Sequence, residues 1–476
     1  MRPHPEHHDA QAVAALLAPD ILDLLETSPS SIAADTEEMH PADLADVAEK
    51  MPRESVPLFL AALPASRAAS ILEYLHEELR TELFEAMSPE QAALLIAQMR
   101  PDDRADTLDE IDEDHAEDIV EALPQATRDE TERLLEYAAD TAGGLMTTQF
   151  VSVPETNTVE VALASVREMA RAGRREAMNT VYAVNEFGAL TGVLSLRELL
   201  AAPEGARISD VAWTEVRHVH PTADREDVAR LTTEYDLVAV PVLDNENRLL
   251  GVVTVDDVID AIQEEQTEDV QKLGGMEAFN EPYMQMSVLG MLKKRAGWLS
   301  ILMVSEMFTT SALQHFDTEL NKLPVLTLFI PLVMSSGGNS GSQATSLITR
   351  AMALKEVQLK DWWRVAAREL PTGIALGSIL GIIGLIRVFV WQYFGLYDYG
   401  KNGVPYQLVA LNTFFSLIGI VMFGSLAGSM LPFVLRRLGF DPASASAPFV
   451  ATLVDVTGLI IYFSVALLVL GKYMGS

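Results

Sequence analysis

Residues 442–471 read PASASAPFVATLVDVTGLIIYFSVALLVLG and contain one charged side chain, Asp455. At 1.5 Å per residue, a helix of this length spans the roughly 30 Å of hydrocarbon in a lipid bilayer. An ionised carboxylate in hydrocarbon is costly, so Asp455 should face a water-filled or ion-filled cavity, where its oxygens favour a hard cation. The alternative is a protonated acid with a structural role.

Four further apolar stretches are long enough to cross a bilayer, which predicts five spans in all. They are Ala296–Gln314, Pro324–Thr349, Pro371–Tyr393 and Pro405–Leu435. Lys and Arg gather before the first span, between the second and third, and after the fourth. The positive-inside rule therefore predicts a multi-pass protein of the cell (inner) membrane, with the N-terminus in the cytoplasm and the C-terminus outside. Glu306 and Arg387 lie inside spans and could pair, anchor helices or line a pore.

The second span contains PLVMSSGGNSGSQ at residues 331–343, an unusual run of small and polar residues for membrane depth. Its glycines permit a close helix contact or a local break, and Asn339 and Gln343, four residues apart, share a helix face. Neutral oxygens of this kind suit a cation that keeps part of its water shell. Packing of small residues without ion contact is the alternative. Combined with the fifth span, this segment predicts a pore lined by Gly338, Asn339, Gln343, Ala451, Thr452 and Asp455.

Charge divides the chain near Glu281. Residues 281–476 hold 14 Lys and Arg against 10 Asp and Glu, whereas residues 1–280 hold 20 against 58, a net charge of −38. So acidic a region disfavours nucleic acid as a partner and favours cations. The chain has no cysteine, which excludes disulfides and thiolate metal sites, and residues 1–10 lack the apolar region of a signal peptide. No Gly-x-x-x-x-Gly-Lys-Ser/Thr loop occurs, so we expect no enzyme activity and no catalytic residues, only transport down an electrochemical gradient.

The N-terminal half begins with a predicted tail, residues 1–30, whose histidines (His4, His7 and His8) could bind a soft metal but are better explained as solvated. Residues 31–138 place Leu, Ile and Ala at helical spacing between repeated prolines, which predicts an acidic domain of short amphipathic helices in a superhelical stack. Asp102 and Asp106 lie one helical turn apart there and could present oxygens to a metal ion or to a neighbouring domain.

Residues 139–262 contain an internal repeat. The segments VYAVNE at Val181 and LTGVLSLREL at Leu190 return 59 residues later as VPVLDN and LLGVVTVDDV. Each copy predicts two strands, a polar turn between them, and a following helix. The repeat resembles a pair of CBS domains, a regulatory module that often binds adenine nucleotides. Thr254-x-x-Asp257 is similar to that module's ribose-binding signature, which implies that ATP could be a regulatory ligand, although Ser195-x-x-Glu198 in the first copy departs from it.

A carboxylate-rich connecting (plug) helix is predicted within residues 256–280, ending at Gly274 and Gly275. Its acids are Asp256, Asp257, Asp260, Glu264, Glu265, Glu268 and Asp269. Like charges one turn apart destabilise a helix, so we expect something to neutralise them. Divalent cations that bridge this helix to the N-terminal domain would do so and would make it a switch sensitive to cytosolic cation. A solvated linker is the alternative.

The order of these parts resembles the MgtE family of bacterial magnesium channels over nearly the whole chain, above all in GGNSGSQ of the second span and ATLVDVTG of the fifth. The resemblance implies a homodimer in the lipid bilayer with a pore on its twofold axis, a magnesium site around Asp455, and closure when cytosolic Mg²⁺ binds among the soluble domains. The gating ligands it implies are Asp102, Asp106, Glu226, Asp236, Asp257, Asp260, Glu265, Glu268 and Asp269. Ser70 stands where family members can have Glu, which could weaken the sensitivity to magnesium.

The sequence thus predicts a multidomain protein with an all-α superhelical N-domain, an α/β CBS-domain pair, a long connecting helix, and an α-helical membrane domain (residues 281–476) with five transmembrane helices per subunit. The predicted function is a magnesium-selective channel or transporter for Mg²⁺ uptake. Alternatives are a carrier of other divalent cations (Mn²⁺, Co²⁺ or Ca²⁺), a cation exchanger, or a membrane-anchored Mg²⁺ or nucleotide sensor without flux, in which Asp455 would have no clear role.

Overall fold

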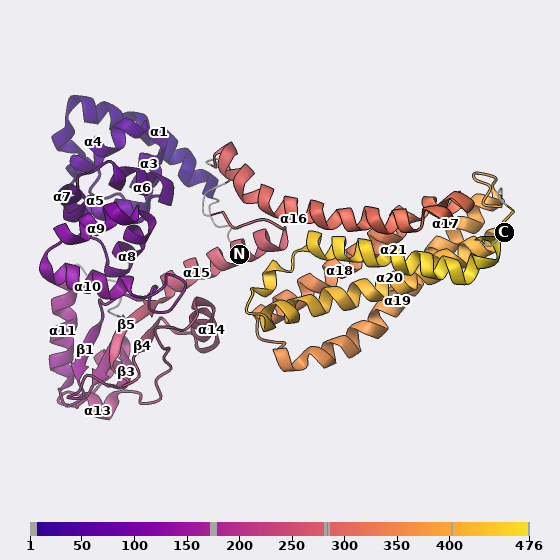
Figure 1. Cartoon of the computed structure of the whole chain (residues 1–476). Helices are drawn as coiled ribbons and strands as arrows, with labels where there is room; N and C mark the ends of the chain where they lie inside the picture. The colour runs from indigo at the N-terminus through magenta and orange to yellow at the C-terminus, as the bar shows by residue number, and fades with distance from the viewer. Residues whose placement is uncertain (1–6, 172–178, 280–282, 284–285, 401–402, 475–476) are drawn as a thin grey trace. The chain divides into compact units, whose positions relative to one another are not determined.

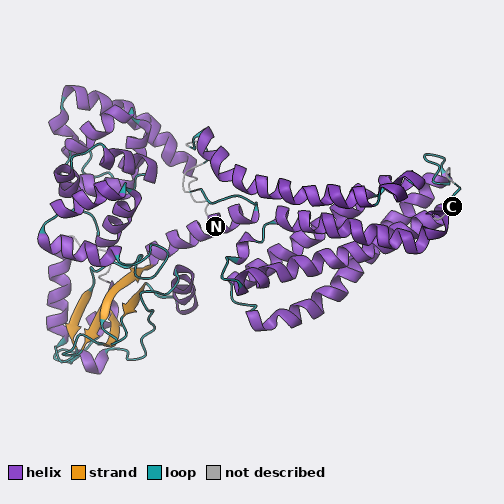
Figure 2. Ribbon diagram, in the orientation of Figure 1, coloured by secondary structure: helices purple, strands orange, loops and turns teal. Residues whose placement is uncertain are grey.

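The computed structural model describes residues 7–171, 179–279, 283, 286–400 and 403–474. The chain forms two compact units, and the boundary between them falls between Glu265 and Gln266, inside helix α15 (Val255–Leu273). The first unit contains short helices followed by the strands, and the second is built from long helices (Figure 1 and Figure 2). The predicted order of a helical N-terminal domain, a repeated strand-and-helix region and a C-terminal region of long helices is confirmed.

The N-terminal part of the first unit is a series of mostly short helices. They are α1 (His7–Thr27), α2 (Ile32–Asp35), α3 (Pro41–Lys50), α4 (Val56–Ala61), α5 (Ala65–Glu73), α6 (Glu77–Glu85), α7 (Pro89–Ile96), α8 (Pro101–Glu110), α9 (Glu113–Ala122) and α10 (Gln125–Leu135). Proline occupies the first turn of α3, α7 and α8, where its missing N–H costs no intrahelical hydrogen bond. The prolines therefore start these helices.

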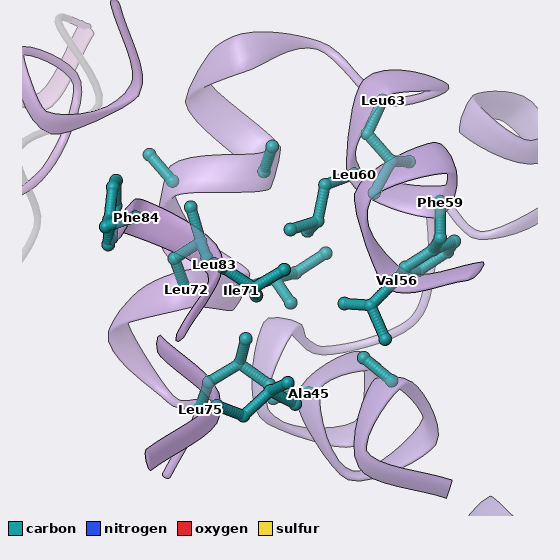
Figure 3. Close-up of a cluster of buried hydrophobic side chains, with 14 of the residues drawn as sticks. Ala45, Val56, Phe59, Leu60, Leu63, Ile71, Leu72, Leu75, Leu83 and Phe84 are labelled. Carbon is teal, nitrogen blue, oxygen red and sulfur yellow. The ribbon is translucent and has the colours of Figure 1, made fainter. Parts of the chain in front are cut away.

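One apolar core joins these helices. Figure 3 shows the side chains of Phe59, Ile71, Leu72 and Phe84, all fully buried, converging from α4, α5 and α6. The Arg67 guanidinium closes the loop before α3 by donating to the carbonyl oxygens of residues 36, 37 and 39, the last at 2.8 Å. Each short helix is thus stabilised mainly by burial of its apolar face rather than by its own length.

The prediction of a tail for residues 1–30 is wrong where the structure describes them. Helix α1 packs against α3 and buries Ala14, Ala18 and Ile21 in the same core. Pro19 lies inside α1, although proline normally interrupts a helix. The spacing of Ala14, Ala18 and Ile21 places them on one helix face, and burial of that face favours the helix despite the proline. His4 lies outside the described residues.

The second part of the first unit contains two small sheets with flanking helices. Its elements are β1 (Val151–Pro154), α11 (Val159–Arg171), β2 (Thr180–Val184), β3 (Leu190–Ser195), α12 (Leu196–Ala201), α13 (Ile208–Val211), α14 (Arg225–Tyr235), β4 (Ala239–Leu243) and β5 (Leu249–Thr254). Strand β2 pairs in parallel with β1 and antiparallel with β3, while β4 and β5 form an antiparallel hairpin. Ala183 opposes Gly192 in the first hairpin, and Val242 opposes Gly251 in the second, so the repeat is confirmed in its register.

The second unit contains the end of α15 and six further helices. They are α16 (Val288–His315), α17 (Asp317–Lys322), α18 (Ile330–Ala353), α19 (Trp362–Tyr393), α20 (Tyr406–Arg437) and α21 (Ala447–Met474). Within the described residues, four helices, α16, α19, α20 and α21, are long and apolar enough to cross a membrane. Helix α18, with 24 residues, has the length but not the apolarity, because of its polar run. Crossing by α18 stays a prediction.

The glycine run of α18 makes a close helix contact and not a break. A Cβ added at Gly424 of α20 would lie 2.4 Å from the Gly337 carbonyl oxygen, and one at Gly428 would lie 2.2 Å from that of Gly341. The Thr345 hydroxyl donates to the Gly428 carbonyl at 2.9 Å. The backbones of α18 and α20 therefore touch, which fits the alternative of small-residue packing.

We expect Gly428→Ala to destabilise the membrane bundle by about 1–3 kcal/mol, because its methyl group would overlap the Gly341 carbonyl oxygen and force α18 and α20 apart. The thermal-unfolding midpoint of the purified protein in detergent should fall. Gly297→Ala on α16 is the control, since a Cβ there meets no atom within 4 Å and alanine favours a helix. Equal midpoints for the two variants would contradict the close contact.

Candidate ion pathway and cation-binding residues

Helix α18 presents a polar face outside its contacts with α20 and α21. Asn339 and Gln343 are both exposed, as is Ser335 one turn earlier, and the Asn339 amide donates to the Ser335 hydroxyl at 3.4 Å. Because Gly337, Gly338 and Gly341 are buried against neighbouring helices, Ser335, Asn339 and Gln343 lie on the exposed side of the helix. The sequence prediction that Asn339 and Gln343 share a face is confirmed.

Helices α18 and α21 meet beside this face. A Cβ added at Gly338 would lie 3.3 Å from the Ala451 Cβ, an ordinary to tight contact. Thr452 is buried, and its hydroxyl donates to the Pro448 carbonyl of its own helix at 3.0 Å. Asp455 follows one turn after Ala451 and is partly buried. Helix α21 therefore contacts α18 through Ala451 and Gly338, and a pore lined by all six residues stays a prediction.

Glu306 and Arg387 have different surroundings. Glu306 on α16 lies close enough to Asp455 for their charges to interact. The Arg387 guanidinium lies over the rings of Phe329 and Trp391, at 5.8 and 5.5 Å from the ring centres. Of the roles left open by the sequence, these contacts favour an anchor for Arg387, and Glu306 is a neighbour of Asp455.

A second group of acids lies where α8 meets the start of α15. We call it the α8/α15 carboxylate cluster, and its members are Asp102, Asp103, Asp106, Asp257 and Asp260. Their charges interact across the two helices, which brings together residues separated by about 150 positions in sequence. Four of the five were candidate gating ligands, so the structure places those four at one point.

The cluster disfavours ionisation. Burial raises the pKa of Asp102 well above its usual range, and the Asp103 charge adds to this effect. The Asp106 side chain reaches solvent, yet the surrounding protein displaces much of the water around its carboxylate. This desolvation is the main cause that raises the pKa of Asp106 to about 7, and repulsion from the Asp103 charge is the second. Burial likewise raises the pKa of Asp257 to about 6, although a hydrogen bond from Thr254 opposes the shift. A cation bound nearby would relieve this repulsion.

Asp102 is 5% exposed, and its Oδ1 has no hydrogen-bond partner among the described residues. Arg100 is a cation beside the cluster: its Nε donates to Asp103, and its Nη1 lies 3.9 Å from Asp256 Oδ2. Arg80 attracts the Asp106 charge. In the described parts of the chain, no three His, Asp or Glu side chains are spaced as ligands of one metal ion. The carboxylates are thus close enough to repel but are not arranged for coordination.

Helix α8 is held in place by a buried arginine. Arg104, 3% exposed, donates to Glu130 of α10 at 2.7 Å, and the other Glu130 oxygen accepts from the Thr148 hydroxyl at 2.5 Å. This chain of contacts connects the helix that carries Asp102 and Asp106 to the segment that leads into β1. It is a hydrogen-bonded ion pair at low exposure and should fix the position of α8.

The proposed nucleotide signature forms a helix cap. The Thr254 hydroxyl donates to Asp257 at the start of α15, and the equivalent Ser195 hydroxyl donates to Glu198 at 2.9 Å. Glu198 also accepts from the Trp213 indole at 2.8 Å. The two copies therefore use the same local geometry, and the hydroxyl of each signature is already engaged.

Protein cations neutralise part of the connecting helix. Arg225 donates to Glu265 and, at 3.1 Å, to Glu264, while the Lys272 ammonium donates to Glu268. The remaining candidates lie around α14 and α15: Glu226 is in the first turn of α14, Asp236 ends that helix with a left-handed φ of 52°, and Asp269 is partly buried on α15. Protein cations thus supply part of the expected neutralisation of α15, at Glu264, Glu265 and Glu268.

Sequence reasoning missed several of these residues. Arg100, Asp103, Arg225 and Lys272 were not singled out. Lys272 lies four residues after Glu268, which is a helical ion-pair spacing, so that signal was available. The contacts of Arg225 with residues 264 and 265 join separate elements and had no local signal.

Known proteins share this organisation. Residues 330–465 match the MgtE family model, described as a divalent cation transporter; residues 39–140 match the MgtE intracellular N domain, and residues 142–205 and 208–264 match the CBS domain. A protein named magnesium transporter MgtE from Thermus thermophilus is 39% identical over 91% of this chain and 94% of its own length.

A protein of the same name from Bacillus subtilis is 30% identical over 90% of this chain and 92% of its own length. A solved structure titled as the cytosolic domain of the Mg²⁺ channel MgtE in complex with ATP is 36% identical, and covers 52% of this chain and 99% of its own, with a TM-score of 0.48. These matches show that the chain belongs to the MgtE family of divalent cation transporters, whose members are transporters and not enzymes.

Proposed function

We propose that this protein is a channel or transporter that carries Mg²⁺ across the cell membrane down its electrochemical gradient. The observation that carries the proposal is that Ala451 of α21 contacts Gly338 of α18 next to the exposed Asn339, while Asp455 lies one turn further along α21. One carboxylate and two neutral amides suit a hard cation that keeps most of its water. The curated relatives are named magnesium transporters, which favours Mg²⁺ among the divalent cations.

The proposed assembly is a homodimer in the inner membrane, with five spans per subunit, α16, α18, α19, α20 and α21. The N-terminus would be cytoplasmic and the C-terminus outside. Exposed polar side chains on α18 are costly in lipid, so a second copy that faces them across a water-filled pore would account for their exposure. The proposed domains are the N-domain (residues 31–138, extended by α1), the CBS pair (139–262), the connecting helix (256–280) and the pore domain (281–476).

Inward flux needs no ATP hydrolysis. An inside-negative membrane potential contributes about 2.3 kcal/mol per elementary charge per 100 mV, and a divalent cation carries two charges. A carrier of Mn²⁺, Co²⁺ or Ca²⁺ is the alternative within transport. A Mg²⁺ or nucleotide sensor without flux is the alternative outside it, and that reading gives no role to Asp455.

The proposed gate responds to cytosolic Mg²⁺ at the α8/α15 carboxylate cluster. The charges of Asp103 and Asp257 repel those of Asp102 and Asp106, and the Asp103 charge also repels Asp260. Asp102 Oδ1 lacks a partner among the described residues, so a divalent cation there would stabilise the contact between α8 and α15. Glu226, Asp236, Glu265, Glu268 and Asp269 are proposed as further ligands. Because Arg225 and Lys272 already pair with three carboxylates of α15, we expect the strongest Mg²⁺ binding at the α8/α15 cluster.

We expect Asp455→Asn to reduce Mg²⁺ flux by at least about tenfold, because the pathway loses its carboxylate. The measurement is uptake into liposomes that contain purified protein and a Mg²⁺-sensitive dye, with an imposed inside-negative potential. Glu356→Gln, which removes one carboxylate outside the spans, is the matched control and should conduct as the wild type does.

Equal flux in wild type and Asp455→Asn would remove Asp455 from the pathway. Absence of flux in all three proteins, despite cooperative unfolding of each, would favour the sensor function. Mn²⁺, Co²⁺ and Ca²⁺ tested in the same liposomes would decide between Mg²⁺ and the other divalent cations.

The α8/α15 cluster should make local stability depend on pH. Its folded-state pKa values lie above the usual value near 4, so the folded form binds more protons, and its stability should fall as pH rises from about 4 through about 7. Hydrogen exchange of α8 and residues 255–265 in the full-length protein, corrected for intrinsic rates, should show less protection at pH 8 than at pH 6. Added Mg²⁺ should restore protection at pH 8.

Asp102→Asn should keep the protection at pH 8 without Mg²⁺ and respond less to Mg²⁺, because it removes a buried charge. Asp109→Asn, an exposed position on the same helix, should behave as the wild type does. Equal Mg²⁺ responses in Asp102→Asn and wild type would place the regulatory site elsewhere.

We also propose that the CBS pair binds ATP, supported by its match to the CBS domain and by Thr254 and Asp257. Thr254→Val should weaken ATP binding by roughly fivefold, the effect of losing one hydroxyl hydrogen bond. Calorimetric titration of the full-length protein with ATP measures this change. Ser195→Ala, in the equivalent cap of the first copy, should leave the affinity unchanged, and equal effects at both positions would contradict the assignment.

A further inference from the structure

The C-terminal end of α15 is bonded to the segment that leads into α21. Lys272 Nζ donates to Asp441 Oδ2 at 2.6 Å and also to Glu268 one turn earlier on α15. Asp441 caps the short turn η6 (Pro442–Ser444), where its Oδ1 accepts from the Ala443 N–H at 2.8 Å. One ammonium thus joins two carboxylates from elements that are remote in sequence.

A second contact follows directly after the end of α15. Gly275, with φ of +75°, packs so closely on Trp298 of α16 that an added Cβ would lie 2.7 Å from the indole Nε1 and 3.2 Å from Pro448 Cγ. Trp298 Nε1 donates to the Ser446 hydroxyl oxygen at 3.1 Å, and the same oxygen accepts from the Phe449 N–H at 3.3 Å. Trp298 therefore connects the end of α15, α16 and the first turn of α21.

The residues between α15 and α16 are fixed as well. Lys294 Nζ donates to the Ala278 carbonyl at 2.5 Å and lies 5.3 Å from the centre of the Phe279 ring. The Gln271 side-chain oxygen accepts from the Phe279 N–H at 2.6 Å. The described part of this connection is held from both sides, by α15 and by α16.

These contacts are of three kinds and involve three different elements. Moving the end of α15 relative to α21 would break the partly buried Lys272–Asp441 ion pair and the tight contact of Gly275 with Pro448 and with Trp298, whose indole is hydrogen-bonded to Ser446. The side chains of Lys272 and Asp441 are 28% and 39% exposed, so solvent screens their attraction only in part. Because these contacts act together, they resist separation of the end of α15 from α21 more than any single contact would.

We propose that Lys272, Gly275, Trp298, Asp441 and Ser446 form a rigid joint, the α15–α21 joint, through which the connecting helix and the N-terminal end of α21 move as one body. Lys272 and Trp298 are its positioning residues. The helix so positioned carries Asp455 two turns further on, and the role of the joint in gating rests on the proposed function. Because Lys272 supplies the positive charge, the joint holds whether or not Mg²⁺ is bound.

The alternative is a latch that must open during gating, and cross-linking distinguishes the two. The natural chain has no cysteine, so Lys272→Cys with Asp441→Cys gives a clean pair for a short, reducible bis-methanethiosulfonate linker in the full-length protein. A rigid joint predicts equal cross-linking rates with and without Mg²⁺, and Mg²⁺-regulated flux that survives cross-linking. A rate that changes more than about threefold with Mg²⁺, or flux lost on cross-linking and regained on reduction, would overturn the joint.

Single substitutions supply the second test. Lys272→Gln should leave flux without cytosolic Mg²⁺ unchanged but raise the Mg²⁺ concentration for half-inhibition by at least about threefold, because closure is transmitted less well. Lys272→Arg should restore the wild-type value, and equal unfolding midpoints would exclude a general folding defect. An unchanged Mg²⁺ response in Lys272→Gln would overturn the positioning role. Should the wild type conduct no Mg²⁺, the proposed function fails, whereas the cross-linking rates still decide the joint.

Discussion

The backbone contact between α18 and α20 is the constraint on which the membrane bundle depends. Gly337 and Gly341 of α18 face Gly424 and Gly428 of α20 with no room for a Cβ. Small residues must therefore occupy one side of α18, whereas the larger amide side chains of Asn339 and Gln343 fall on the other side and are exposed. Packing and the candidate ion pathway are thus two consequences of one helix contact.

The large excess of carboxylates in the N-terminal half is distributed unevenly over the folded chain. Arg225 and Lys272 pair with acids of α15, so part of the connecting helix is neutralised from within. The α8/α15 cluster differs, because burial and mutual repulsion outweigh the attraction of Arg100 for Asp102 and of Arg80 for Asp106. The carboxylates that a bound cation would stabilise therefore lie where the N-domain meets the connecting helix.

Helix α15 carries both part of the carboxylate cluster and the lysine of the α15–α21 joint. Its first turn belongs to the carboxylate cluster, and its last turn carries the lysine that bonds to the segment before α21. Within the proposed function, the contact that responds to Mg²⁺ therefore involves the first turns of α15, and the proposed α15–α21 joint involves its last turn.

The sequence by itself determined several parts of this protein, because periodicity and motifs are encoded within one or two turns. These parts are the short helices of the N-domain, the hairpin repeat with its register, the long apolar helices, the shared face of Asn339 and Gln343, and the family. Only the tertiary structure decided that α1 packs into the core, that the glycine run of α18 is a contact and not a break, and that Arg225 and Lys272 neutralise α15. Lys272 and Asp441 are 169 residues apart, and local sequence does not specify such a partner. Burial, close approach and ion pairing between distant segments depend on the packing of whole elements, which no single stretch of sequence contains.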